Sequence, residues 1–254
     1  MLNIAIRAAR AAGNIILKQV DRVHEIPADK KGINDFVSEV DRAAERIIID
    51  TLNKAYPDHS ILAEESGHHG HNEFQWIIDP LDGTTNFLHG FPQFAVSIAL
   101  QCKSRLEVAV VYDPLKDELF TAVNGQGANL NDRRIRVTKH RHLEGALLGT
   151  GFPFKEQERL DEYLETFRAL FTMTAGIRRA GSAALDLSYV ACGRLDGFWE
   201  FGLEPWDLAA GVLIIQESGG MVGNLDGSEF KLTNGDIVAA NPRLFAEIIK
   251  ILDR

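Results

Sequence analysis

The 254-residue chain has few of the features that would place it in a specialised class of protein. Its only cysteines, Cys102 and Cys192, lie far apart and at no metal-binding spacing, which indicates a reduced, cytoplasmic protein with two incidental thiols. No run of about 18 apolar residues is present, so we expect no membrane span. The N-terminal residues lack the apolar core of a signal peptide.

Positive charge is also scarce. The chain has 27 Lys and Arg against 36 Asp and Glu, a net charge of −9. Surfaces that bind nucleic acid or anionic membranes need clustered cations, so we expect neither kind of direct binding. An acidic balance suits a site that concentrates divalent cations, although many acidic proteins have no such site. The 45% of hydrophobic and 25% of charged residues are typical of an ordinary globular protein.

The spacing of apolar residues predicts two helices near the N-terminus. The first covers residues 2–20, and the polar stretch 21–35 is a loop or an irregular hairpin. The second follows Ser38, which fits an N-cap, while Asp41 resembles the acidic member of a capping box. Pro57 closes this helix.

A strand-rich block follows Pro57, and the second half of the chain alternates strands with helices. We predict strands at 60–63, 73–78, 94–102, 106–112, 118–123, 146–150, 197–201 and 221–224, and helices at 159–171, 183–192, 205–217 and 242–253. No repeat or linker separates the halves. We therefore expect one layered domain, residues 1–254, with sub-lobes at about 1–140 and about 141–254.

The most informative stretch joins an apolar strand to Asp79, Asp82 and a Gly83-Thr84 turn. Ligands commonly bind where a strand ends and a helix begins, and the first N–H groups of a helix can hold a phosphate. Because Mg²⁺ prefers oxygen ligands, the two carboxylates predict a magnesium and phosphate site here. The alternative is an Asx-type turn that caps a helix. The Asp-x-Asp-Gly-Thr motif of haloacid-dehalogenase phosphatases does not match, because an extra residue separates the aspartates.

Three weaker signals accompany this stretch. Glu64 and Glu65 end a short strand, and Asp207 lies in the first turn of a helix. In the stretch 178–186, Gly181-Ser182 precedes another apolar helix and is either a second anion or hydroxyl contact or a helix cap. Taken one at a time, these residues are equally typical of a solvated surface, a helix cap and compensation of a helix dipole. The histidines of residues 68–71 have no helical metal-ligand spacing, and we interpret them as an ordinary loop.

Together, these segments resemble the inositol monophosphatase family of lithium-sensitive, magnesium-dependent phosphatases. The matching stretches are Glu64-Glu65-Ser66, Asp79-Pro80-Leu81-Asp82-Gly83-Thr84-Thr85-Asn86-Phe87, Gly181-Ser182-Ala183-Ala184 and Trp206-Asp207. The sequence at 94–99 and 150–154 is most similar to bacterial inositol-1-monophosphatases of the extragenic-suppressor type.

The resemblance implies an α/β (α+β) fold, a five-layered αβαβα sandwich, assembled as a homodimer. It also implies hydrolysis of myo-inositol monophosphate or a similar small polyol phosphate. Fructose 1,6-bisphosphate, a 3′-phosphoadenosine nucleotide and histidinol phosphate are other possible substrates, although the acidic Glu200 favours a hydroxyl-rich leaving group. Relatives of the extragenic-suppressor type can instead act as protein partners of the transcription antitermination machinery for ribosomal RNA, which is the alternative function.

The resemblance further implies a role for each matching residue. Glu64, Asp79 and the Leu81 carbonyl would hold a first Mg²⁺, and Asp79, Asp82 and Asp207 a second. The phosphate and the substrate hydroxyls would contact Gly83, Thr84, Gly181, Ser182, Ala183 and Glu200, with Asp82 and Asp207. Glu64 and the Thr84 hydroxyl would take the proton of the attacking water, and Asp41 is also assigned to catalysis. Lys30 or Lys31, with Asp35 and Asp41, would belong to a mobile loop at the metal site.

Overall fold

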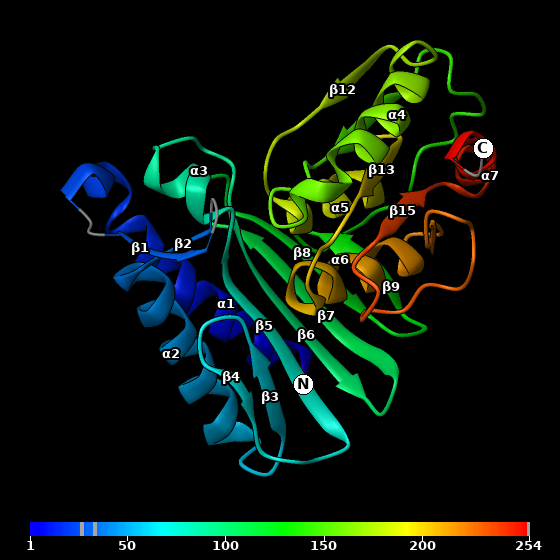
Figure 1. Ribbon diagram of the computed structural model, residues 1–254. Helices are drawn as coiled ribbons and strands as arrows, with labels where there is room; N and C mark the ends of the chain where they lie inside the picture. Colours follow the sequence, from blue (N-terminus) through cyan, green and yellow to red (C-terminus); the bar gives the residue numbers. More distant parts are fainter. Residues whose placement is uncertain (26–27, 33–34, 253–254) are drawn as a thin grey trace.

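Two helices pack side by side on the outer face of the larger sheet (Figure 1). The computed structural model describes residues 1–25, 28–32 and 35–252, without the side chains of residues 24–37. Helix α1 (Leu2–Leu17) buries mainly alanines, which let its backbone approach the sheet closely. Helix α2 (Glu39–Ala55) begins at Ser38, whose side chain forms the predicted capping box with Asp41.

The larger sheet has the strand order β10-β9-β8-β7-β6-β5-β3-β4. Neighbouring strands are antiparallel except for β3 and β5, which are parallel. The bounds are β3 (Ser60–Ala63), β4 (Gly67–His69), β5 (Phe74–Asp82), β6 (Ala95–Cys102), β7 (Arg105–Asp113), β8 (Glu118–Val123), β9 (Gly127–Leu130) and β10 (Arg133–Arg134).

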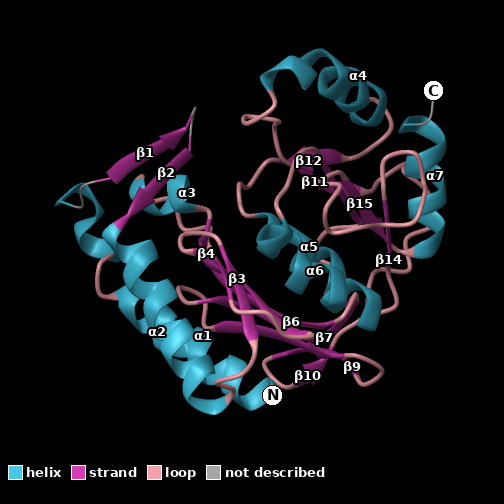
Figure 2. Ribbon diagram, turned by 60° about the horizontal axis from the view of Figure 1, so that its bottom comes forward, coloured by secondary structure: helices cyan, strands magenta, loops and turns pink. Residues whose placement is uncertain are grey.

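Helices α5 (Ala183–Ala191) and α6 (Pro205–Glu217) form the middle layer, between the two sheets (Figure 2). Every residue from Leu208 to Ile215 is buried, although an ordinary surface helix buries only one stripe. Helix α6 contacts strands β5 to β8 of the larger sheet and β14 (Met221–Gly223) of the smaller one. The apolar character of this helix on all sides is therefore explained by burial between two sheets.

The smaller sheet has the order β12-β11-β13-β15-β14. Its remaining strands are β11 (Leu147–Thr150), β12 (Gly176–Arg178), β13 (Gly197–Glu200) and β15 (Ile237–Ala240). Helices α4 (Leu160–Phe171) and α7 (Pro242–Leu252) cover its outer face (Figures 1 and 2). The layers thus run α1/α2, sheet, α5/α6, sheet, α4/α7, which confirms the predicted αβαβα sandwich. The division into sub-lobes near residue 140 stays a prediction.

The structure also corrects several details of the predicted elements. Strand β5 does not end at residue 78 but continues through Asp82. The 21–35 stretch contains the 3₁₀ turn η1 (Val20–Glu25) and strand β1 (Ala28–Gly32), which pairs with β2 (Asp35–Ser38), so the hairpin alternative is correct. A second 3₁₀ turn, η2 (Gln157–Arg159), precedes α4. Among the described residues, no helix is long and apolar enough to cross a membrane.

Candidate metal centre and substrate cleft

Asp79 and Asp82 face the same side of the sheet because strand β5 is irregular between them. In a regular strand, side chains three positions apart point to opposite faces. Here Asp79 pairs with Ser97 and Asp82 with Ala95, so two residues of β5 oppose the single Val96 of β6. This extra residue is a β-bulge, which shifts the alternation by one position. The bulge therefore turns an Asp-x-x-Asp spacing into two converging carboxylates.

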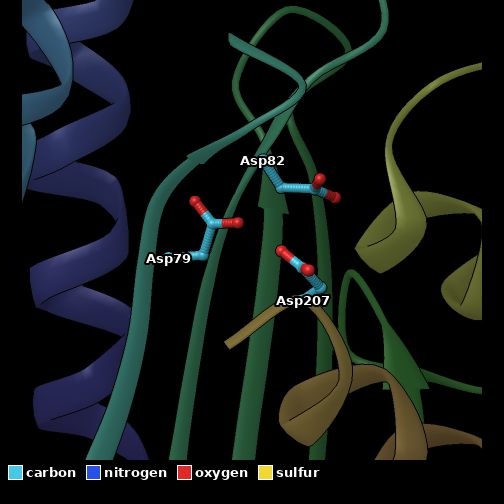
Figure 3. A group of neighbouring side chains, drawn as sticks. All are labelled: Asp79, Asp82 and Asp207. Carbon is cyan, nitrogen blue, oxygen red and sulfur yellow. The ribbon is translucent and has the colours of Figure 1, made fainter. Parts of the chain in front are cut away.

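Asp207 completes the group from the first turn of α6. One carboxylate oxygen from each of Asp79, Asp82 and Asp207 lies within 4.8 Å of the other two. Figure 3 shows the three side chains directed toward a common space between β5 and the start of α6. We call these three residues the acidic triad. No other such group of three or more metal-ligating side chains occurs in the part of the chain that the structure describes.

Each member of the acidic triad also accepts hydrogen bonds that fix its position. The Leu81 N–H donates to Asp79 Oδ1 at 2.9 Å, as in an Asx-type turn. The Glu204 N–H donates to Asp207 Oδ2 at 2.8 Å in a capping box. The Asx-type turn at Asp79 and the helix cap at Asp207, which the sequence offered as structural alternatives, are therefore both present. They hold the two side chains in place.

Asp82 is held from the opposite side of the site. Its Oδ2 accepts from the Ser182 hydroxyl at 2.6 Å and from the Ala184 N–H at 2.7 Å. Ser182 is the N-cap of α5, and its oxygen accepts from the Leu185 N–H at 3.4 Å. Asp82 thus links the larger sheet to the start of a middle-layer helix.

The pKa values of the triad carboxyls are raised. Burial is the largest cause for all three, followed for Asp79 by the charge of Glu64 and for Asp207 by the charge of Asp82. Hydrogen bonds from Ser182 and Ala184 oppose the effect at Asp82 and leave its pKa at about 6, while that of Asp207 is about 7. Burial therefore disfavours the charged forms of all three carboxyls.

Glu64 and Thr84 lie at the same site, as predicted. The Glu64 carboxyl is hydrogen-bonded to Asp79 and raises the pKa of that residue. The Thr84 hydroxyl lies 2.8 Å from Asp41 Oδ1 and 3.0 Å from the Leu81 carbonyl. Asp41 is completely buried, and its other oxygen accepts from Ser38. Residues 41 and 84, distant in sequence, are thus in direct contact.

Gly83 has a conformation that favours glycine. It has φ of +95° and is the N-cap of the short helix α3 (Thr84–Leu88). A Cβ at this position would lie 2.9 Å from the Gln93 carbonyl and 3.2 Å from that of Gly181. The tight approach of these three backbones explains why a glycine follows Asp82.

A cleft of about 600 Å³ contains the acidic triad. Its lining includes all the remaining residues that the resemblance assigned to phosphate and substrate: Gly83, Thr84, Gly181, Ser182, Ala183 and Glu200. Glu200 ends β13 and extends over Gly151, where any Cβ would collide with its carboxylate. Burial and the charge of Asp186 raise the pKa of Glu200 well above its usual range.

The comparison with known families agrees with this geometry. The model of the inositol monophosphatase family matches residues 1–254. The chain belongs to the inositol monophosphatase family.

Individual relatives cover nearly all of the chain. The "Nus factor SuhB" of Pseudomonas aeruginosa is 56% identical over 255 aligned positions, covering 98% of this chain and 94% of its own. The crystal structure of the extragenic suppressor protein suhB from Bartonella henselae is 43% identical with a TM-score of 0.96, covering 99% of this chain and 98% of its own. The structure of inositol monophosphatase from Anabaena is 42% identical with a TM-score of 0.89, covering 99% and 94%.

The acidic triad of this inositol monophosphatase family member fits a hard divalent cation. All the donors are oxygens, which Mg²⁺ prefers. Burial first, and then the charges of neighbouring carboxylates, raise the pKa values of Asp79, Asp82 and Asp207, and a bound cation would stabilise the charged forms. The donor set therefore matches the predicted ion, while its identity stays a prediction.

Three further residues of the cleft region lie in stretches that the sequence singled out, 79–87 and 178–186, but were assigned no role of their own. The Asn86 side chain donates to the carbonyls of Gln93 and Ala180, at 2.7 and 2.9 Å, and so joins α3 to the segment before α5. Arg179 lines the cleft, and Asp186 is buried beside it, one turn after Ser182. The i, i+4 spacing of Ser182 and Asp186 on one helix face was the available signal.

Other candidates from the sequence take no part in this site. In the 68–71 loop, His69 contacts Ser66 at 2.9 Å and the rings of His68 and His71 lie 5.4 Å apart, without forming a group of three ligands in the described region. The side chains of Lys30, Lys31 and Asp35 lie outside those that the structure describes, so their assignment to a mobile loop stays a prediction. Asp41, assigned to the same loop, lies instead in the first turn of helix α2 and is buried.

Proposed function

We propose that this protein is a Mg²⁺-dependent phosphatase that hydrolyses myo-inositol monophosphate or a similar small polyol phosphate to the free alcohol and phosphate. The convergence of Asp79, Asp82 and Asp207 in one cleft is the observation that carries the proposal. A phosphate monoester resists attack because its own charge repels the nucleophile. A site of this kind must therefore supply cations and position water.

The proposed ion ligands follow the family assignment. Glu64, Asp79 and the Leu81 carbonyl would hold one Mg²⁺, and Asp79, Asp82 and Asp207 a second. When bound, these ions would neutralise the phosphate and make a water molecule more acidic.

The chain's own groups would orient that water and receive its proton. When the Thr84 hydroxyl donates to Asp41 Oδ1, 2.8 Å away, its oxygen is left to accept a hydrogen bond from water in the cleft that Thr84 lines. Glu64, whose carboxyl is hydrogen-bonded to Asp79, would take the proton by general base catalysis.

The alcohol side of the substrate would contact the starts of the middle-layer helices. Ser182 and Ala183 lie at the first turn of α5, and Glu200 lines the same cleft. Hydroxyl and carboxyl groups of this kind can pair with the several hydroxyls of a polyol. Gly83 and Thr84 would offer backbone N–H groups to the phosphate.

The experiment that tests this function is phosphate release from a panel of inositol, fructose and nucleotide phosphates, with and without Mg²⁺. We expect Mg²⁺-dependent turnover of inositol 1-phosphate. The Asp82→Asn variant should lose it while remaining folded, because an asparagine oxygen can still accept from Ser182 and Ala184. Unchanged turnover in that variant would remove the metal centre from the proposal. We also expect Li⁺ to inhibit by occupying the second ion site.

We further propose that the protein forms a homodimer, as the family resemblance implies. Light scattering after size-exclusion chromatography should give twice the chain mass of 28.2 kDa. A monomer at micromolar concentration would contradict this.

A second function rests on the 56% identity with a protein named Nus factor SuhB. We propose that this chain also contacts transcription antitermination factors. The contact would be between proteins, because a net charge of −9 disfavours direct binding to RNA. A pull-down with purified elongation factors, repeated with Asp82→Asn, should show binding that does not depend on catalysis. Equal binding to beads without the protein would contradict it.

A further inference from the structure

Two separate parts of the chain line the cleft on the side of the smaller sheet. Residues 152–156, which we call the wall segment, lie between strand β11 and the turn η2. Residues 200–203, which we call the connecting segment, lead from the end of β13 toward Asp207 in α6. Within the part of the chain that the structure describes, the wall segment pairs with no strand of either sheet. Its position must therefore be fixed by other contacts.

Arg159, the last residue of η2, binds Asp236 through two parallel hydrogen bonds. Its Nη1 donates to Asp236 Oδ1 at 2.8 Å, and its Nη2 donates to Asp236 Oδ2 at 2.7 Å. Nη1 also donates to Glu156 Oε2 at 2.9 Å, and Nε donates to Glu162 Oε2 at 3.0 Å. The guanidinium carbon lies 4.5 Å from the ring centre of Phe201. Paired bonds between a guanidinium and a carboxylate fix the orientation of both groups.

Asp236 and Glu156 both contact the connecting segment at Gly202. The Gly202 N–H donates to Asp236 Oδ1 at 3.1 Å. Glu156, the last residue of the wall segment, packs against the same glycine, because a Cβ on Gly202 would lie 2.9 Å from the Glu156 carboxyl carbon. Arg159, Asp236 and Glu156, which we call the clasp, therefore join the wall segment to the connecting segment.

The pair of Arg159 and Asp236 differs from an ordinary ion pair on a surface. Exposed pairs contribute little because water screens their charges. Here the two side chains are only 25% and 21% exposed, and the contact has two bonds. The bonds of Arg159 to Glu156 and Glu162 are local to the start of α4, but Asp236 lies 77 positions later. The start of a helix therefore does not explain the clasp.

The core beside the clasp has contacts of its own. Tyr163 of α4 and Trp199 of β13 are fully buried and stacked, with ring centres 6.3 Å apart. Trp199 Nε1 also donates to the Thr166 hydroxyl at 3.1 Å. These contacts hold α4 on the smaller sheet, so we expect a chain without the clasp to remain folded. The clasp adds the position of the wall segment, which the sheets do not fix.

We propose that Arg159 is a positioning residue that, through Asp236 and Glu156, holds the wall segment against the connecting segment and so keeps this side of the substrate cleft in place. The inference rests on the proposed phosphatase function. Arg159 itself lies outside the lining of the cleft and outside the acidic triad, so it acts on substrate binding and not on the reacting phosphorus. Without the clasp, fewer molecules would have the wall segment in the position that binds substrate.

The test measures KM and kcat for myo-inositol 1-phosphate with Mg²⁺, and the thermal midpoint, in six forms of the full chain. The forms are the wild type, Arg159→Gln, Arg159→Lys, Asp236→Asn, the double variant of Arg159→Gln with Asp236→Asn, and Arg194→Gln. Arg194 is the matched control, because its guanidinium also forms two bonds with one carboxylate, that of Glu118, and it lies outside the lining of the cleft.

We expect Arg159→Gln to raise KM about tenfold, the rise that follows when the binding arrangement falls to about a tenth of the molecules. Its kcat should change less than about threefold, because the substrate-bound form has the wall segment in place. Asp236→Asn should raise KM similarly, and the double variant should raise it no further, because both changes break one contact. Arg159→Lys should fall between, because lysine keeps the charge but not the paired bonds. Arg194→Gln should keep the wild-type KM.

Several results would overturn the inference. A lower thermal midpoint with an unchanged KM in Arg159→Gln and Asp236→Asn would make the clasp a purely structural contact and leave the proposed function intact. Fully additive effects of the two changes on KM would show that Arg159 and Asp236 do not act together. If Arg159→Gln does not fold, Arg159→Lys and Asp236→Asn decide by the same KM criterion. A wild type without turnover would remove the proposed function and this inference with it.

Discussion

Strand β5 and the starts of helices α5 and α6 form two sides of the candidate metal centre by different means. On β5, a bulge brings Asp79 and Asp82 to one face. On the helices, Ser182 and Asp207 occupy capping positions, where these residue types are common for structural reasons alone. The strand side therefore carries the stronger argument for function, because folding does not otherwise require two converging buried carboxylates.

The two sides also differ in how their carboxyls are supported. Asp82 accepts two hydrogen bonds from the start of α5, and its pKa is about 6. Asp207 accepts one from Glu204, and its pKa is about 7. Each donor stabilises the charged form, so proton affinity falls as donors are added. The charged form is therefore better stabilised at Asp82 than at Asp207.

The largest effect is expected when one carboxylate from each side of the site is neutralised. Asp79→Asn and Asp207→Asn should each lower Mg²⁺-dependent phosphate release by more than the roughly 10–100-fold typical of outer-shell residues. Both should stay folded, because asparagine can accept the same backbone N–H. Asp161→Asn, on the exposed face of α4, is the control. Full activity in Asp207→Asn alone would confine the ion site to β5.

Gly83→Ala should destabilise the protein by about 2–4 kcal/mol, since it adds a positive-φ strain to an overpacked contact with Gln93. Urea denaturation measures this. Gly219→Ala is the matched control, because Gly219 has φ of +87° but no atom within 4 Å of the place that a Cβ would occupy. Its cost should stay near 1–2 kcal/mol, the strain alone. Equal losses of stability in the two variants would show that the contact with Gln93 contributes nothing.

The metal-free chain should be less stable at pH 8 than at pH 5. The pKa values of Asp82 and Asp207, about 6 and about 7, are raised from 3.8. Between about pH 4 and pH 7 the folded chain therefore holds protons that the unfolded chain has lost, and raising the pH through this window favours unfolding. Urea midpoints in chelator should show the fall, and Asp207→Asn should reduce it. An equal fall in the Asp207→Asn variant would show that Asp207 does not contribute to the pH dependence of stability.

The smallest effect is expected for Ser182→Ala, which removes the N-cap of α5 and a donor to Asp82. We expect a loss of about 1 kcal/mol in thermal or urea unfolding. Ser188→Ala is the control in the same helix, because Ser188 donates only to the Ala184 carbonyl one turn back. A larger loss in the control would show that burial, and not the cap, governs these serines.

The sequence predicted the long elements and most of the site, but by two different routes. Sequence patterns placed α2, α6 and strands β3, β5, β6, β7 and β8 of the larger sheet, because these elements are long or have clear ends. Short strands such as β4, β10 and β12, two or three residues each, were missed because they depend on their neighbours for pairing. Strand β15 was missed although all four of its residues are buried.

The site itself could not have been assembled from local patterns. The strand end and the Gly83-Thr84 turn predicted a shared site for Asp79 and Asp82, but nothing in their spacing predicts the bulge that brings the two carboxylates together. The contact of Thr84 with Asp41 spans 43 positions and follows only from the packing of α2 against β5. Arg179 was assigned no role of its own, because an arginine next to Arg178 has no distinctive sequence signature. Its contacts with Phe152 and Phe154 follow only from the fold.

The most direct test of the metal-dependent site is to titrate Mg²⁺ into the chelator-treated chain while following phosphate release from myo-inositol 1-phosphate and the thermal midpoint in the same samples. We predict no turnover before addition, with activity and midpoint both rising over one range of Mg²⁺ concentration. Undiminished turnover in excess chelator, or a midpoint that does not respond to Mg²⁺, would contradict the account.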